Sequence, residues 1–113
     1  MTAHADTIWS AAIAAVRPEA LLAGLALPLD DVDRIVVVGG GKAAAGMAAG
    51  VEALLGADAL TRHRVTGLVS VPEGCGRQLA RIEVRETRPL AANLPTPAVV
   101  EATEEMLAAV ARL

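Results

Sequence analysis

Aromatic side chains are almost absent from this chain. Trp9 is the single aromatic residue among 113, with neither Phe nor Tyr, although hydrophobic residues make up 54% of the sequence. An aromatic side chain buries about 150–250 Å², so a core of small aliphatic residues gains less free energy at each position. The length allows one domain at most, and we expect that domain to be modestly stable.

Cysteine and clustered basic residues are also scarce. Cys75 is the only cysteine, which excludes an internal disulfide, and one thiol with His4 and His63 cannot build a structural zinc site. Lys and Arg total 10 against 13 Asp and Glu, for a net charge of -3. Neutralising nucleic-acid phosphates needs a concentrated positive face. We therefore expect no nucleic-acid partner, and we assign no metal ligand.

Long apolar runs are missing as well. Arg17, Pro28 and the glycines at 39–41 interrupt them, and nothing approaches the roughly 20 residues that a membrane span requires. His4 and Asp6 stand where a signal peptide would have its basic start. We expect a soluble, cytoplasmic protein with no membrane partner.

Apolar spacing predicts a helical segment over residues 5–27. It contains an amphipathic helix at 5–16 with Asp6 as its N-cap, and a short second helix that starts at Pro18. The β-branched run 34–38 is apolar on both faces. It predicts a strand that is buried on both sides of a parallel sheet and stops at Gly39.

A strand–helix–strand–strand–helix core is predicted over residues 34–113. A helix should follow from Lys42 to Leu55 with Gly56 as its stop, then strands at 66–71 and 82–86, and a last helix opened by Thr96 and Pro97. The buried residues predicted for that helix are Val99, Val100, Met106, Leu107 and Val110. Strands that alternate with helices indicate a parallel sheet. We expect an α/β, Rossmann-like fold with flanking helices that is incomplete in this chain.

Three glycines mark the turn between the first strand and its helix. Gly39, Gly40 and Gly41 would let the backbone approach a ligand, and a helix amino end directs unpaired N–H groups and a positive dipole at it. This geometry binds anions. We therefore take the three glycines as candidate substrate- or phosphate-binding residues.

Neither standard nucleotide motif is met at this turn. The glycines fit a loose dinucleotide fingerprint, but Glu73, the nearest acidic candidate for the ribose, lies too far along. The turn does not match the phosphate-binding loop of many ATPases either, because Val36 stands in place of its first glycine and Ala43 in place of its Ser or Thr. If the chain were a nicotinamide-dependent reductase, it would therefore lack the acidic residue that binds the ribose.

Lys42 is the candidate catalytic residue. It is the only lysine, since every other basic residue is arginine. A positive charge beside a helix amino end opposes the helix dipole, and such conflicts are tolerated more often at functional sites. The ammonium group would place a point charge on a phosphate or carboxylate, although a solvated lysine at a helix start is the alternative.

Arg88 and Asn93 are further candidates for binding substrate or phosphate. They belong to a loop expected at 87–97, after the last strand. Ligands bind at the carboxyl ends of the strands in open α/β sheets. An exposed structural loop explains these two residues equally well.

Three segments together resemble the N-terminal part of the glycerate 2-kinase family. They read VVVGGGKAAAGMA at 36–48, TGLVSVPEG at 66–74, and NLPT at 93–96 before a helix. The family is also described as MOFRL-associated or DUF4147, and as hydroxypyruvate reductase in older usage. The match runs from about residue 8, and the three segments in this order are more specific than any one alone.

The resemblance implies that residues 1–113 are the N-terminal part of a kinase domain. Such an enzyme uses ATP and Mg²⁺ to convert D-glycerate to 2-phosphoglycerate, and Lys42 aligns with the family's active-site lysine. Family members are much longer, so we expect a fragment that lacks the C-terminal domain and is inactive alone. The expected partners are D-glycerate and the nucleotide, and a homodimer is left open. Arg88-Pro89 and Thr96 depart from the family's usual histidine-proline and acidic residue, so the substrate stays open.

A second function class is consistent with the same residues. The chain could be a non-catalytic module with a Rossmann-like fold that binds an anion or nucleotide, or another protein. Phosphate binding without turnover would distinguish this alternative from a kinase.

Overall fold

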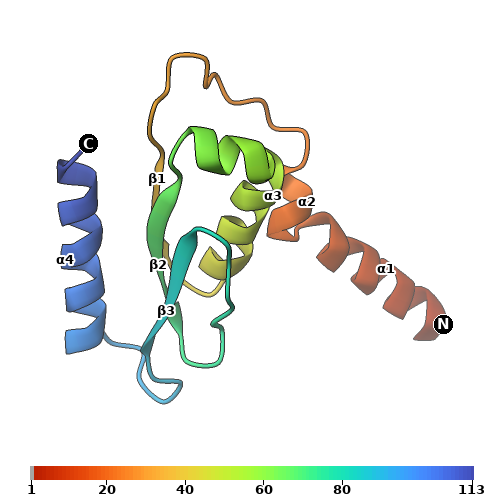
Figure 1. The fold of residues 1–113 in the computed structure, drawn as a ribbon. Helices are drawn as coiled ribbons and strands as arrows, with labels where there is room; N and C mark the ends of the chain where they lie inside the picture. Colours follow the sequence, from red (N-terminus) through yellow and green to blue (C-terminus); the bar gives the residue numbers. More distant parts are fainter. Residues whose placement is uncertain (1) are drawn as a thin grey trace.

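The computed structural model describes residues 2–113 as three strands and four helices (Figure 1). In chain order they are α1 (Thr2–Ala15), α2 (Pro18–Leu22), β1 (Val36–Gly40), α3 (Ala44–Arg62), β2 (Thr66–Pro72), β3 (Ile82–Arg88) and α4 (Pro97–Ala111). The strands form one parallel sheet in the order β1-β2-β3, with α3 on one face and α4 on the other. The predicted α/β class with flanking helices is confirmed.

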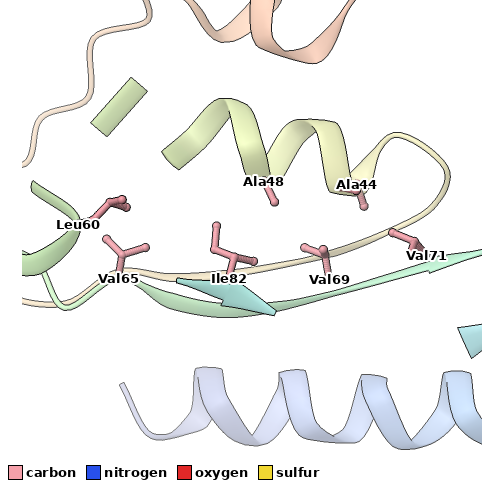
Figure 2. Close-up of a cluster of buried hydrophobic side chains, with 8 residues drawn as sticks. Ala44, Ala48, Leu60, Val65, Val69, Val71 and Ile82 are labelled. Carbon is pink, nitrogen blue, oxygen red and sulfur yellow. The ribbon is translucent and has the colours of Figure 1, made fainter. Parts of the chain in front are cut away.

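The core lies between the sheet and α3 (Figure 2). Val69 and Val71 point from β2 toward Ala44 and Ala48 of the helix, and Val65, the residue before β2, lies beside Leu60. Val65 and Val71 are 0% and 1% exposed. Alanine on the facing side lets a helix lie close to the sheet, so small side chains still exclude water.

The pairing of β1 with β2 requires a glycine at one position. Val37 lies opposite Gly67 in the register. A Cβ on Gly67 would lie 2.9 Å from the Val37 carbonyl carbon and closer still to its oxygen. Because these are backbone atoms, a side chain at Gly67 would force the two strands apart.

A loop connects the parallel strands β2 and β3 without a helix. Parallel neighbours usually need a crossover of a dozen or more residues, whereas here residues 73–81 make the connection. Glu52 of α3 holds its end, because the Glu52 carboxylate accepts N–H bonds from Ala80, Arg81 and Ile82 at 2.9, 2.7 and 2.9 Å. Burial raises the pKa of this carboxyl, but the three donors outweigh burial and leave the pKa below its ordinary value.

The N-terminal helices differ from the prediction in their bounds and surroundings. α1 begins at Thr2, so Asp6 lies inside the helix and is not its cap. α2 begins at Pro18 as predicted, but its helical residues end at Leu22 and not near residue 27. None of the α1 residues is buried, and the helix extends away from the body of the fold (Figure 1). No helix within residues 2–113 has the length and apolar character to cross a membrane.

The strand before the glycine turn is less buried than predicted. Val38 is 42% exposed, and Val36 and Val37 are only half-buried, because β1 is an edge strand of this sheet. The strand also continues through Gly39 and Gly40, which pair with β2. The predicted stop at Gly39 was therefore wrong.

The bounds of the remaining elements shift in the same way. Gly56 ends the first helical part of α3 as predicted, since its φ of 78° and ψ of 163° lie outside the helical region, but a second helical part follows and continues to Arg62. β3 continues to Arg88, two residues beyond the predicted end, because its pairing with β2 continues past a register shift at Val71/Pro72.

The last helix begins as predicted but covers a narrower stripe than predicted, since only Val99 and Met106 of the expected buried residues belong to it. The Thr96 hydroxyl oxygen accepts from Val99 N–H at 3.3 Å, and Pro97 occupies the first turn. The covered stripe consists of Val99, Ala102, Met106 and Ala109, whereas Val100, Leu107 and Val110 are exposed. Tertiary packing selects only one stripe of an apolar helix.

Gly67→Ala should lower the free energy of unfolding by about 1–3 kcal/mol, because the added methyl group collides with the backbone of β1. Urea unfolding of the two proteins measures the difference. Gly39→Ala is the matched control, since its Cβ would meet nothing closer than Val69 Cγ1 at 3.8 Å. Equal losses of unfolding free energy in the two variants would contradict the close approach of the Val37 backbone to Gly67.

Glu52→Gln should cost about 1–2 kcal/mol of unfolding free energy at pH 7, because an amide cannot accept all three N–H groups. The folded pKa of Glu52 is below the ordinary 4.5, so its contribution is complete above pH 4.5 and disappears as the pH falls through the folded value. Urea unfolding from pH 7 to pH 3 should show the two proteins converging. A difference in unfolding free energy that stays constant with pH would refute the role of the Glu52 carboxylate. Glu104→Gln, at an exposed position of α4, is the control.

Candidate functional site

The carboxyl ends of the three strands meet at a cavity of about 250 Å³. Its walls come from the glycine turn after β1, the ends of β2 and β3, and one side of α4. Parallel pairing places these ends on the same edge of the sheet. This is the edge at which open α/β folds bind ligands.

The glycine turn forms a wall without side chains. Gly39, Gly40 and Gly41 all line the cavity. Gly41 has a φ of 113°, which favours glycine, and its N–H donates to the Ser70 carbonyl at 2.9 Å. This bond fixes the turn against β2.

Two hydroxyl groups lie beside each other in this cavity. Ser70 Oγ and Thr87 Oγ1 are 2.5 Å apart, so one of them donates to the other. Ser70 alternates along β2 with core residues and therefore faces α4. The Thr87 carbonyl accepts from Thr96 Oγ1 at 3.0 Å, which joins β3 to the cap of α4.

Ser70, Thr87 and Thr103 were not among the residues predicted from the sequence, although all three line the cavity. A serine within the otherwise apolar run of β2 was the available signal for Ser70. The pairing of Ser70 with Thr87 has no local signal, since the parallel register alone brings the strands together.

Arg88 lines the same cavity as the three glycines. It is the last residue of β3 and not part of a loop as predicted. Its Nη1 donates to Asn93 Oδ1 at 2.5 Å, and its carbonyl accepts from Glu73 N–H at 2.8 Å. Asn93 does not line the cavity but holds the Arg88 guanidinium from outside.

Lys42 lies in the turn between Gly41 and α3 and is exposed. It follows the cavity wall directly in the chain, but its side chain is not part of the lining. Within residues 2–113 its ammonium group forms no ion pair. The backbone N–H groups of Lys42 and Ala43 likewise have no hydrogen-bond acceptor in the described chain. These donors can meet an anion at the amino end of α3.

Ion pairs hold α4 against the sheet beside the cavity. Arg85 of β3 donates to both carboxylate oxygens of Glu105 at 2.9 Å and to Glu83 at 2.8 Å. The hydrogen bond to Glu105 raises the pKa of Arg85 and lowers that of Glu105. This contact is one of those that hold α4, and with it one wall of the cavity, against the sheet.

The residues present fit a phosphate better than a magnesium ion. The glycine turn and Lys42 offer N–H groups and a positive charge, whereas the cavity lining contains no carboxylate. The described residues hold no group of three or more His, Cys, Asp or Glu arranged to bind a metal. Mg²⁺ is usually held by one or two carboxylates together with substrate phosphates, and this site supplies no such carboxylate.

A comparison with protein families identifies the chain. A family model described as "Domain of unknown function (DUF4147)" matches residues 4–113. The chain belongs to the DUF4147 family. DUF4147 is the N-terminal domain of glycerate 2-kinase family proteins, so the resemblance found in the sequence is confirmed at this level. Neither the curated proteins nor the solved structures contain a match to the chain.

Proposed function

We propose that this DUF4147 chain is the N-terminal portion of an ATP-dependent glycerate 2-kinase, which phosphorylates D-glycerate to 2-phosphoglycerate. The observation that carries the proposal is the cavity shared by the glycine turn and Arg88, with Lys42 next in the chain. Family membership supports the kinase class. The substrate is the one that the resemblance to the glycerate 2-kinase family implies, and the residue roles are inferred from that resemblance together with the chemistry of the cavity.

The cavity suits a small hydroxy acid. Its volume of about 250 Å³ is below the roughly 300–1,000 Å³ of pockets that take drug-sized ligands. Arginine binds carboxylates with two parallel N–H bonds, and Asn93 fixes the Arg88 group that would do so. The hydroxyl groups of Ser70 and Thr87 can exchange hydrogen bonds with those of the acceptor.

The glycine turn and Lys42 fit the transferred phosphoryl group. When bound, ATP supplies this group, and its phosphate oxygens can accept from the N–H groups of Lys42 and Ala43. The Lys42 ammonium offsets negative charge as the acceptor oxygen bonds to phosphorus and the bond to ADP breaks. No step is assigned to a metal, because the cavity lining offers no carboxylate for one.

Lys42→Ala should lower kcat for the phosphorylation of D-glycerate about 100-fold or more, because a charge aimed at the reacting phosphate is lost. The assay uses the gene product as its own cells make it, with ATP and D-glycerate. Circular dichroism should show an unchanged fold, since Lys42 is exposed.

Arg34→Ala is the control for the loss of one positive charge, since Arg34 is exposed and precedes the amino end of β1. Its kcat should equal that of the wild type. Unchanged turnover in Lys42→Ala would overturn the role of the lysine. Phosphate binding by the wild-type product without any turnover would overturn the kinase proposal and favour an anion-binding module.

A further inference from the structure

A second and larger cavity lies at the opposite edge of the sheet. It has a volume of about 510 Å³ and is bounded by the segment before β1 and by the last turns of α3. The chain there runs past the amino ends of β1 and β2, where Ile35 N–H donates to the His63 carbonyl at 3.0 Å. The length of the strands therefore separates this cavity from the glycine turn.

The break in α3 shapes this cavity. Leu54 and Leu55 line it from before Gly56, and Ala59 and His63 line it from after Gly56. The backbone angles at Gly56, φ 78° and ψ 163°, lie outside the helical region. The local break thus places two parts of α3 around one space, which Leu27 and Leu29 also line.

His63 lines the cavity and has one ring nitrogen without a hydrogen-bond partner among the described residues. Its side chain is buried, with 6% of the residue exposed, and Nδ1 lies 2.5 Å from the Val32 carbonyl oxygen. A carbonyl only accepts, so Nδ1 donates in this hydrogen bond, and Nε2 is an acceptor whenever the ring carries a single proton. Every fully buried side-chain N or O among the described residues has a partner. Nε2 has no such partner, so it is not fully buried. Because His63 lines the cavity, Nε2 is accessible from there.

The charged groups in the lining are mainly acidic. Asp30 and Asp33 both belong to it. Arg62 belongs to it as well, so the lining holds two negative charges and one positive charge. The cavity therefore combines an aliphatic wall with two carboxylates, one guanidinium group and one accessible imidazole nitrogen.

We propose that this cavity binds a small aliphatic molecule that carries a protonated primary amine. The hydrocarbon body would contact the leucine side chains, and the ammonium group would donate to His63 Nε2 and pair with Asp30 and Asp33. Apolar walls with a few convergent polar groups are typical of small-molecule sites. An ammonium group suits these polar groups, because it can donate a hydrogen bond to the imidazole nitrogen and its positive charge is opposite to that of the two carboxylates.

Calorimetric titration of the purified gene product with 3-methylbutylamine tests the proposal. We expect a single site with a Kd on the order of 1 mM, as suits a ligand of so few atoms. The carboxylate of similar shape, 4-methylpentanoate, should not bind. Binding of both compounds with equal affinity would overturn the proposal. Absence of binding by both compounds at concentrations well above the expected Kd would overturn it as well.

Substitutions of the two acidic lining residues test whether the amine binds in this cavity. Asp30→Asn combined with Asp33→Asn should weaken amine binding at least 10-fold. Asp31→Asn removes one negative charge from a neighbouring exposed residue outside the lining and should leave the Kd unchanged. Equal weakening by Asp31→Asn would show a general charge effect and refute the site. Lys42→Ala should bind the amine normally, so this result is independent of the proposed kinase activity.

Discussion

Parallel pairing of β2 with both of its neighbours is the constraint on which the rest of the structure depends. It brings the carboxyl ends of three strands to one edge and the amino ends to the other. Gly41, Ser70 and Arg88 are far apart in the sequence, yet they meet because each lies at or just after a carboxyl end. The candidate site is therefore a consequence of strand direction.

Strand direction has to be maintained by the connections, and the two connections do so differently. Between β1 and β2 the helix α3 packs its alanines against valines of the sheet. Between β2 and β3 no helix is present, and polar contacts take its place. Glu52 holds the end of that loop through three N–H groups, and Glu86 accepts from Gly74 and Gly76 N–H at 2.9 and 3.0 Å. Buried hydrophobic area and carboxylate hydrogen bonds thus perform the same structural task.

The two edges of the sheet differ in their chemistry. The carboxyl edge combines free backbone N–H groups, hydroxyls and Arg88, which suits small anions. The amino edge combines leucines with Asp30, Asp33 and a buried imidazole, which suits an aliphatic cation. Residues of α3 line only the amino-edge cavity, whereas the carboxyl-edge cavity is lined by the glycines that precede this helix.

Local patterns in the sequence determined the order of elements, the parallel sheet, the glycine turn and the start of α4 at Thr96. These features follow from backbone preferences and apolar spacing over a few residues. Tertiary structure alone decided that β1 lies at an edge, that Ser70 meets Thr87, and that Arg88 is held by Asn93. Those outcomes depend on strand register and on which helix face finds a partner, and both are properties of the packed chain that no short window of sequence encodes.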